Sequence, residues 1–530
     1  MDIDAAVVEW RQRLGAEQVL NAQQAQEAYG ADTAANERVI PAALRILDSG
    51  LLPEVMRIAQ RHKVPVHPIS TGHNWGYGTA LPPGDGSVLI DLGGLQKILH
   101  FDAEFGVVTV EPGVTQGMLS DFLDAGQHPF LVPVTGAGPT CSLLSNALER
   151  GYGVTPITDH FAAVTDVEAV LADGSVYRTA MHEAGGEEIA RLFKYGIGPY
   201  SVGLFTQSAF GIVTKMSIVL AKRPECVKVC LFSLKDDSLL EAAAAAIRNV
   251  LSRLPGTVGA INLMNQHRVL AMSAPYPEGR LVNGLIPPNV ISELGSQYQL
   301  FPWTGFGTLY GTKGVVAAAQ KEIRRALAGI ASRLIFLTPS MAKTLARAAA
   351  RLPGGLGERI GSTAQTLALS LELVAGRPNE TALPLAYWRN PNPPKGQFRD
   401  PARDGSGLIW YAPLVPMRPS TMRAYVKMVH EVTARHGIEP LITFTTLSDK
   451  LVDSTVPIVF KRDDPKAVAA AKACYAELVQ TGRAAGYFPY RVGIGGMQTV
   501  VGLQDTARTF HARLHDCLDP NGILSPGRYR

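Results

Sequence analysis

The apolar pattern of this 530-residue chain changes once, near residue 225. Before that point, short β-rich runs such as SVLIDL (87–92) and TKMSIVLA (214–221) alternate with helical stretches, and Gly or Asp-Gly ends many of the runs. After it, strands such as KVCLFSL (228–234) alternate with long Ala-rich helices such as LLEAAAAAIRNVLSRL (239–254). The pattern predicts an α+β protein of two regions, the second built on an antiparallel sheet covered by helices.

More local expectations follow from the same pattern. Residues 1–36 and 115–125 are expected to be helical, and a strand followed by a helix is expected over residues 37–62. The Pro- and Gly-rich stretch Arg389–Gly407 is expected to be a long functional loop, because structureless segments of that length are uncommon inside domains.

Composition excludes several classes of protein. Apolar residues make up 46% of the chain and charged residues 18%, which favours a large folded core over disorder. The net charge is only +4, and Lys and Arg are scattered, so no nucleic-acid partner is expected. The five cysteines include no CxxC pair, so neither a disulfide framework nor a metal site is predicted, and a reducing compartment is favoured.

The N-terminal sequence MDIDAAVVEWRQRL is acidic and then amphipathic, which does not fit a signal peptide. No apolar run reaches the length needed to span a bilayer. We therefore expect a cytoplasmic, soluble protein with no membrane partner. A periplasmic location is the alternative if the chain is exported across the membrane together with a partner.

The segment PISTGHNWGYG (68–78) carries the strongest chemical signal. A strand leads into a loop with three glycines, whose backbone can approach a ligand closely. Consecutive N–H groups together with the hydroxyls of Ser70 and Thr71 suit a pyrophosphate. An isolated loop of this kind is more often an ordinary turn. The chain lacks GxxxxGK[ST] and a strand–GxGxxG–helix unit, which argues against P-loop NTPases and nicotinamide Rossmann domains.

Further segments favour a cofactor-binding loop over an ordinary turn. A second Gly-rich loop spans 135–156 and a small-residue segment, FTQSAFGIVTK, spans 205–215, so that three segments could wrap one extended cofactor. The informative motifs are STGHNWGYG (70–78), EPGVT (111–115), ERGYGVTP (149–156), FKYGIGPY (193–200), FTQSAFGIVTK (205–215) and DPNGILSPGR (519–528). With these motifs in this order and spacing, the chain resembles the vanillyl-alcohol oxidase / p-cresol methylhydroxylase family of flavoproteins over nearly its whole length.

The resemblance implies a specific organisation. An FAD-binding domain of two α+β subdomains would span residues 1–225, and a cap domain with a large antiparallel sheet would span 226–500. The segment 501–530 would return to the FAD domain, and the isoalloxazine ring would lie between the domains. A homodimer or a larger oligomer is expected. The cofactor-binding residues implied by the resemblance are Ser70, Thr71, Gly72, His73, Asn74, Gly76, Gly138, Pro139, Ser142, Asn146, Gly151, Gly153, Thr155, Gly211, Ile212, Val213, Tyr387 and Arg528.

The resemblance also implies a phenolate pocket at Tyr77, Tyr490 and Arg491. A free phenol has a pKa of about 10 and is neutral at pH 7. A guanidinium and two hydroxyl donors stabilise the anion, and a few charge-assisted hydrogen bonds lower its pKa by several units. Taken singly, each of these residues is more often a packing residue; their joint match favours the pocket.

The implied reaction moves a hydride from the benzylic carbon of a para-substituted phenol to flavin N5, through a p-quinone methide. Water addition would give an alcohol, proton loss an alkene, and a benzylic alcohol would give an aldehyde or ketone. Asp159 lies where the family has an acidic residue that acts as a base. The alternative is that Asp159 caps a helix beginning at His160.

Some positions depart from the family pattern. His73 stands where relatives often carry Arg, and Leu408 stands where one branch links FAD to a His. Tyr387 in LAYWRN is a candidate for a tyrosyl–FAD bond; non-covalent FAD and a structural Tyr387 are the alternatives. The electron acceptor is left open between oxygen and a c-type cytochrome.

The sequence is therefore consistent with three hypotheses about the function. The first is an FAD-dependent oxidase, dehydrogenase or hydroxylase of 4-alkylphenols or 4-hydroxybenzylic alcohols, including bulky lignin-derived phenols. The second keeps FAD and replaces the phenol with a hydroxy acid or a sugar. The third is a catalytically silent FAD-binding scaffold.

Overall fold

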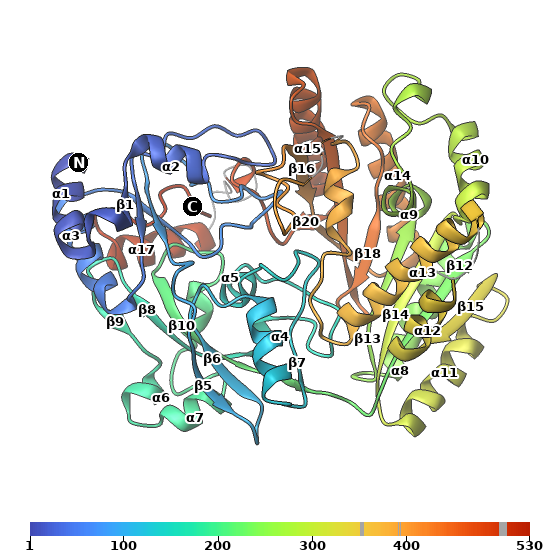
Figure 1. Cartoon of the computed structure of the whole chain (residues 1–530), viewed down its shortest axis with the longest axis horizontal. Helices are drawn as coiled ribbons and strands as arrows, with labels where there is room; N and C mark the ends of the chain where they lie inside the picture. The colour runs from blue at the N-terminus through green and yellow to red at the C-terminus, as the bar shows by residue number, and fades with distance from the viewer. Residues whose placement is uncertain (350–353, 391, 393, 498–505, 530) are drawn as a thin grey trace.

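The computed structural model describes residues 1–349, 354–390, 392, 394–497 and 506–529. Two regions lie side by side (Figure 1). The first carries a four-stranded, a five-stranded and a two-stranded sheet and ends with β11 (Ala221–Lys222), and the second begins with β12 (Cys226–Leu234). The α+β class with a large antiparallel sheet is confirmed.

The first sheet has the strand order β1-β2-β4-β3, formed by β1 (Val19–Leu20), β2 (Ala43–Arg45), β4 (Val88–Asp91) and β3 (Val66–Ile69). The helices α1 (Ile3–Leu14) and α3 (Leu52–His62) pack together, and the Trp10 indole donates to the carbonyl of Val55 at 3.1 Å. Residues 1–36 are thus not one helical stretch: Gly15, at φ 98°, ends α1, and α2 (Ala22–Tyr29) begins after β1.

The second sheet is antiparallel, with the order β5-β6-β10-β8-β9. Its strands are β5 (Ile98–Asp102), β6 (Val107–Val110), β10 (Ile212–Val219), β8 (Val164–Val170) and β9 (Val176–Tyr177), and β7 (Phe130–Leu131) pairs with β11 apart from it. The helix α4 (Gln116–Ala125) starts where the sequence predicts, because the Thr115 hydroxyl accepts from the Met118 amide at 3.2 Å.

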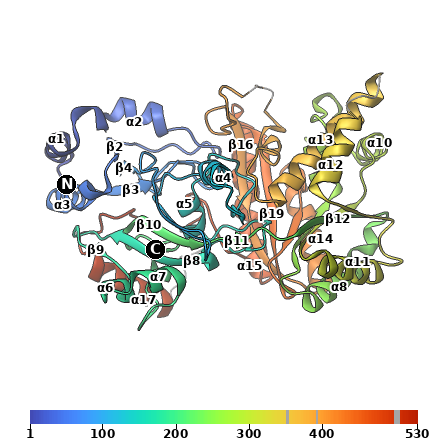
Figure 2. The same ribbon diagram turned by 60° about the horizontal axis from the view of Figure 1, so that its bottom comes forward.

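The short helices α6 (Ala180–Glu183) and α7 (Glu187–Leu192) follow β9. The helices α4 and α5 (Leu143–Leu148) lie toward the second region in two views (Figure 1, Figure 2).

The second region is built on one antiparallel sheet of order β15-β12-β14-β13-β18-β19-β17-β20, with β16 also paired to β19. The strands that follow β12 are β13 (Val258–Asn265), β14 (Trp303–Gly311), β15 (Arg333–Leu337), β16 (Ser406–Tyr411), β17 (Pro413–Pro416), β18 (Thr443–Thr446), β19 (Leu451–Lys461) and β20 (Phe488–Pro489). The described residues of the Pro- and Gly-rich stretch before β16 are largely irregular, as expected.

Helices cover both faces of this sheet unequally. One face packs against α8 (Leu240–Arg253), α11 (Lys313–Ala326), α14 (Pro419–Arg435) and α15 (Pro465–Ala484) in a single apolar cluster. On the other face, α12 (Pro339–Ala349) and α13 (Gly354–Val374) cover only the end near β12 and β14. The remaining helices of this region include α9 (Gln266–Ser273) and α10 (Pro288–Tyr298). The part of the second face near β13, β18 and β19 is therefore left to the first region.

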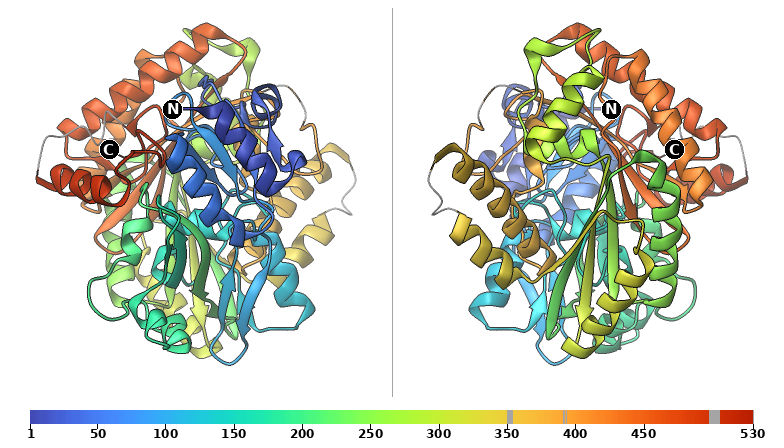
Figure 3. Two further views of the ribbon diagram at one scale, coloured as in Figure 1. Left: turned by 90° about the vertical axis from the view of Figure 1, so that its left-hand side faces the viewer. Right: turned by 90° about the vertical axis from the view of Figure 1, so that its right-hand side faces the viewer.

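The C-terminal segment returns to the first sheet. After α17 (Thr506–Leu518), the Ile523 carbonyl accepts from the Val66 amide and the Ser525 amide donates to the Val66 carbonyl, both at 2.8 Å. Figure 3 shows α17 beside the N-terminal region. Across the described residues, no helix is long and apolar enough to cross a membrane.

Candidate cofactor and substrate site

A cavity of about 470 Å³ lies where the two regions meet. One wall comes from β3 and the loop after it, the loop 135–152 and the segment 205–213. The C-terminal residues Leu524, Ser525 and Arg528 also line the cavity. The sheet of the second region supplies the opposite wall. The sheet residues on that wall are Asn262, Thr443, Thr445, Thr455, Leu408 and Trp410, joined by Arg268 from α9.

The Gly-rich loop 70–78 gets its shape from its glycines. Gly72, Gly76 and Gly78 have φ values of 68°, 78° and 124°, which residues with a Cβ rarely adopt. A Cβ on Gly78 would lie 2.8 Å from Ile494, and one on Gly76 would lie 2.3 Å from Trp410. The loop is thus held between the two regions only because it carries no side chains there.

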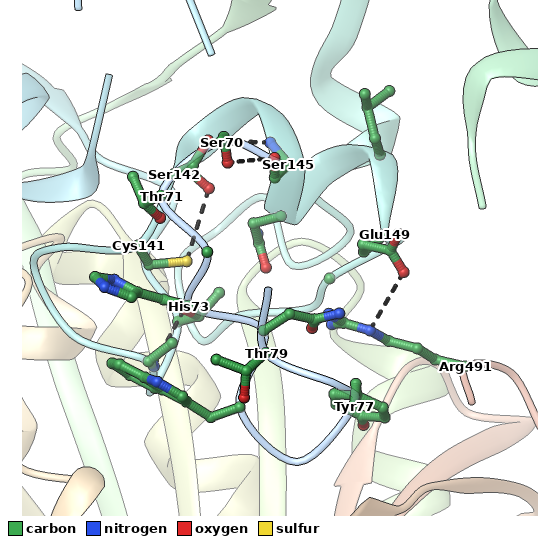
Figure 4. Close-up of a pocket in the computed structure, with 18 of the residues that line it drawn as sticks. Ser70, Thr71, His73, Tyr77, Thr79, Cys141, Ser142, Ser145, Glu149 and Arg491 are labelled. Carbon is green, nitrogen blue, oxygen red and sulfur yellow. Dashed lines mark hydrogen bonds and ion pairs between the residues drawn. The ribbon is translucent and has the colours of Figure 1, made fainter. Parts of the chain in front are cut away.

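Hydroxyl groups line the inner side of this loop. Figure 4 shows the Ser70 and Ser145 hydroxyls facing each other, with oxygens 2.6 Å apart, near Thr71 and Ser142. Hydroxyls beside a side-chain-free backbone suit the phosphates of a dinucleotide, and the elongated cavity beyond them suits its rings. The residues present therefore fit FAD.

Most of the cofactor residues expected from the sequence line this cavity. They are Ser70, Thr71, Gly72, His73, Asn74, Ser142, Asn146, Gly151, Gly211, Ile212, Val213 and Arg528. His73 stacks on Trp75 at 4.8 Å between ring centroids, and its Nδ1 is buried without a hydrogen-bond partner.

Another group of expected cofactor residues lies behind the wall: Gly76, Gly138, Pro139, Gly153 and Thr155. The Gly76 amide donates to the Thr33 hydroxyl at 2.8 Å, and a Cβ on Gly153 would lie 2.2 Å from the Val134 carbonyl. In this arrangement they support the loops and do not touch the cavity.

Tyr387 is also outside the cavity lining, although its neighbour Ala386 is part of it. Its hydroxyl donates to the Asp404 carboxylate at 2.6 Å. Burial and the Asp404 charge hold the pKa of Tyr387 well above its usual value. Leu408 does line the cavity, at the position where one branch of the resembled family has a His.

Asp159 lies away from the cavity lining as well. Its carboxylate accepts from the Ala162 amide at 3.1 Å, the contact of a capping residue. The ring of His160 contacts the Asn146 side chain. The base role of Asp159 stays a prediction.

The three expected phenolate residues come together in the cavity. The Arg491 guanidinium lies over the Tyr77 ring, 4.3 Å from its centroid, and Tyr490 lines the same space. Arg491 also donates to the Asn74 side chain and has its Nε 3.6 Å from the Glu149 carboxylate (Figure 4). Burial raises the pKa of both tyrosines, so they are neutral hydrogen-bond donors at neutral pH.

Glu149 links two arginines of this cluster. Its carboxylate pairs with Arg491 and with Arg528, and its side chain is 13% exposed. Burial raises its pKa, but the charges of Arg528 and Arg491 outweigh burial and hold the pKa below its usual value. One carboxylate thus balances two guanidiniums, which leaves the cluster with a surplus positive charge for a bound anion.

Asp453 is buried close to Arg491 without lining the cavity, and sequence reasoning missed it. It lies on β19, is 4% exposed, and has one carboxylate oxygen without a partner. Burial raises its pKa to about 7 against the opposing charge of Arg491. The available signal was a lone Asp within the apolar run LVDSTVPIVF (451–460).

The sheet wall follows the alternation of side chains along its strands. Thr445 pairs with both Asn262 and Asp453, and Thr443 pairs with Thr455, so these polar residues share one face. The intervening residues Leu263, Phe444, Val452 and Val456 belong to the helix-covered apolar cluster. This polar face, with Arg268 above it, was also missed.

Comparisons with known proteins agree with this site. The family described as "FAD binding domain" matches residues 48–180. The 1'-carboxy-chondrochloren decarboxylase of Chondromyces crocatus is 32% identical over 534 residues, which cover 99% of this chain and 97% of the relative. The flavoprotein subunit of 4-cresol dehydrogenase (hydroxylating) from Pseudomonas putida is 27% identical, covering 89% of this chain and 84% of that protein.

A solved structure extends the likeness to three dimensions. The crystal structure of p-cresol methylhydroxylase with substrate bound superposes with a TM-score of 0.87 at 26% identity, over 99% of this chain and 96% of that one. Fold and cofactor site therefore point to the same kind of protein.

Proposed function

The chain belongs to the vanillyl-alcohol oxidase / p-cresol methylhydroxylase family of FAD-dependent oxidoreductases, and from this premise we propose that it oxidises the benzylic carbon of a para-substituted phenol bound as its phenolate. The observation that carries the proposal is the cluster of Arg491, Tyr77 and Tyr490 at the cavity, where one carboxylate balances two guanidiniums.

The residues of this cluster have distinct roles in the proposal. Arg491 supplies a permanent positive charge, and the neutral hydroxyls of Tyr77 and Tyr490 donate to the phenolate oxygen. Charge-assisted hydrogen bonds of about 1.5–3 kcal/mol each lower the pKa of the bound phenol by several units. The phenolate then pushes electrons toward the para carbon, which favours a p-quinone methide as the first product.

Asp453 is the proposed proton acceptor. Its pKa of about 7 lets it exchange a proton at neutral pH, and its carboxyl group lies close enough to Arg491 for their charges to interact. It would take the phenol proton on binding, or the proton of a water that adds to the quinone methide. Asp159 is kept as the alternative base.

FAD, when bound, accepts the two electrons that leave the benzylic carbon. We propose that residues 1–225 and the returning segment 501–530 hold it, while residues 226–500 shape the substrate end of the cavity. Oxygen or a c-type cytochrome would reoxidise the cofactor, and a homodimer or larger oligomer is the proposed assembly.

A second candidate reaction is oxidative decarboxylation. The relative that is 32% identical over almost the full length of both chains is named a decarboxylase. If the carbon next to the benzylic carbon carries a carboxylate, benzylic oxidation gives a quinone methide that can release CO₂. The electron pair of the broken C–C bond forms an alkene and restores the phenolate, so the step needs no oxidant beyond FAD.

The test is anaerobic reduction of the yellow protein, followed by flavin absorbance. 4-Ethylphenol is expected to bleach the flavin and its O-methyl ether is not, because the ether cannot form a phenolate. Arg491→Gln is expected to slow bleaching by about 100-fold or more, and Arg491→Lys by less, because the ammonium keeps the charge.

The other outcomes are equally informative. Equal bleaching by the phenol and its ether would overturn the phenolate mechanism. Bleaching by a hydroxy acid or a sugar alone would favour an FAD enzyme that acts on such a compound in place of a phenol. If no phenol bleached the flavin, a catalytically silent scaffold would be favoured. Admitting air to the reduced protein then reveals whether oxygen is an acceptor.

A further inference from the structure

We propose that the sheet wall of the cavity carries a carboxylate-binding subsite centred on Arg268, so that the substrate is a phenol with an anionic carboxylate on its para side chain. The inference rests on the phenol oxidation proposed above and narrows its substrate class. It depends on contacts of Arg268 that differ from those of the other arginines at the site.

Arg268 is fixed in place by its local structure. It lies in the first turn of α9, and its amide donates to the Asn265 side chain at 3.0 Å. Its Nε donates to the Thr443 hydroxyl on β18, also at 3.0 Å. The guanidinium is thereby held over the polar face of the sheet, where it lines the cavity.

Arg268 has no acidic partner among the residues that the structure describes. Its Nη1 is buried with no hydrogen-bond partner, and the ion pairs of the described chain do not include it. Arg491 and Arg528, by contrast, share the Glu149 carboxylate. A buried cation without a counter-charge destabilises a fold unless a bound anion supplies that charge.

The charge of Arg268 persists under working conditions. Burial lowers the pKa of Arg268 to about 10, so the group stays protonated at neutral pH. A planar guanidinium with a free N–H is suited to a carboxylate, which it binds by two parallel hydrogen bonds.

Neutral polar groups surround the Arg268 guanidinium. Thr445 and Thr455 line the cavity from β18 and β19, and Asn262 on β13 has a buried side-chain oxygen without a partner. β13 and β18 are direct neighbours in the sheet (Figure 1). Hydroxyls and an amide around one cation complete a site for an anion without cancelling the cation's charge.

The sheet order separates this subsite from the phenolate cluster. Arg268 contacts β18, whereas Tyr490 and Arg491 directly follow β20, and β19 and β17 lie between these strands. Three strand spacings amount to about 14 Å at the backbone, and side chains from both sides reduce the gap. In a para-substituted phenol the oxygen and the side chain point in opposite directions, so one substrate can contact both arginines.

The test compares three phenols that differ only at the end of the side chain: 3-(4-hydroxyphenyl)propanoate, its neutral amide and 4-propylphenol. Each is mixed anaerobically with the FAD-loaded protein, and the apparent Kd and the limiting rate of flavin reduction are measured separately. The acid is expected to bind about 10-fold or more tightly than the amide.

Arg268→Gln is expected to remove the preference for the acid, mainly through Kd, and Arg268→Lys to retain part of it. Arg280→Gln is the matched control, because Arg280 is an exposed arginine of the same region that pairs with Glu293 outside the cavity. Its preference for the acid should equal that of the unaltered protein.

The outcomes separate the two proposals. If all three phenols bleach the flavin but the acid has no advantage, or if Arg268→Gln keeps the advantage, the subsite is wrong while phenol oxidation stands. If none of the phenols bleaches the flavin, phenol oxidation is overturned and the subsite with it. A variant that has lost FAD is recognised by its absorbance, and Arg268→Lys then decides the question.

Discussion

The two walls of the cavity are built by different means. The wall from the first region consists of loops whose glycines remove side chains, as at Gly78, where a Cβ would lie 2.8 Å from Ile494. The wall from the second region consists of side chains that alternate along paired strands, such as Asn262, Thr445 and Thr455. Loop walls suit a cofactor of fixed shape, whereas a sheet wall can change its chemistry by single substitutions without changing the backbone.

The two walls also differ in how their charges are balanced. On the loop side, Glu149 from the first region ties together Arg491 and Arg528, so the cations there have a built-in partner. On the sheet side, Arg268 has no such partner among the described residues, and Asp453 is held at a raised pKa. We infer that Glu149 balances part of the positive charge on the loop side, where a phenolate supplies the rest, and that a substrate supplies the whole counter-charge at Arg268.

The largest expected effect comes from removing the partner on the loop side. Glu149→Gln leaves two buried guanidiniums without a carboxylate and should lower stability by about 3–5 kcal/mol. Thermal unfolding followed by circular dichroism measures the change. Glu293→Gln, which breaks an exposed pair with Arg280, is the control and should leave the Tm unchanged. An unaltered Tm in Glu149→Gln would contradict the view that Glu149 is the built-in counter-charge of the two arginines.

Asp453 gives a pH test of the sheet side. Its folded pKa of about 7 lies above the unfolded value of about 3.9, so between these values the folded protein holds one more proton than the unfolded chain. The stability that Asp453 contributes is therefore present at pH 4 and is lost as the pH rises through 7. Asp453→Asn should gain stability relative to the unaltered protein between pH 4 and pH 8, by about 1–4 kcal/mol.

The measurement is the Tm difference between the two proteins across that pH range. Asp463→Asn removes an exposed carboxyl of the same region and should show a flat difference. A flat difference for Asp453→Asn as well would mean that its carboxyl is solvated, and its role as a proton acceptor would lose its support.

The glycine loop gives a smaller effect. Gly78→Ala forces a Cβ into a residue at φ 124° and against Ile494, and should cost about 1–3 kcal/mol and weaken FAD retention. Gly84 has open space around its Cβ position, so Gly84→Ala is the matched control. FAD content per chain and Tm are measured together; equal values for the two variants would show that the loop is not shaped by its glycines.

The smallest expected effect is at Tyr387. Its hydroxyl is occupied by Asp404 and lies outside the cavity lining, so we expect FAD to be held without a bond to this residue. Acid precipitation should release the yellow colour from the unaltered protein and from Tyr387→Phe alike. A pellet that stays yellow in the unaltered protein and loses its colour in Tyr387→Phe would establish the tyrosyl bond instead.

Sequence reasoning worked where the signal is local. The helix after Thr115, the Ala-rich helix α8 and the glycine loop 70–78 were all predicted close to where they lie. The structure places Asp159 in a capping contact with the Ala162 amide and leaves Gly153 and Thr155 outside the cavity lining, so their predicted roles at the site stay predictions. A sequence motif does not distinguish the residues that contact a ligand from those that support the loop.

The sequence alone therefore indicated the α+β class and the FAD cofactor, and it predicted the pocket residues Tyr77, Tyr490 and Arg491, because each rests on a motif or on local periodicity. Tertiary structure decided the rest. Arg268, Asn262 and Asp453 lie far apart along the chain, and only strand register and the order β13-β18-β19 bring them to one face of one sheet. A one-residue shift in that register would turn Asp453 into the helix-covered core, and no motif encodes such a register because it is set by pairing between distant strands.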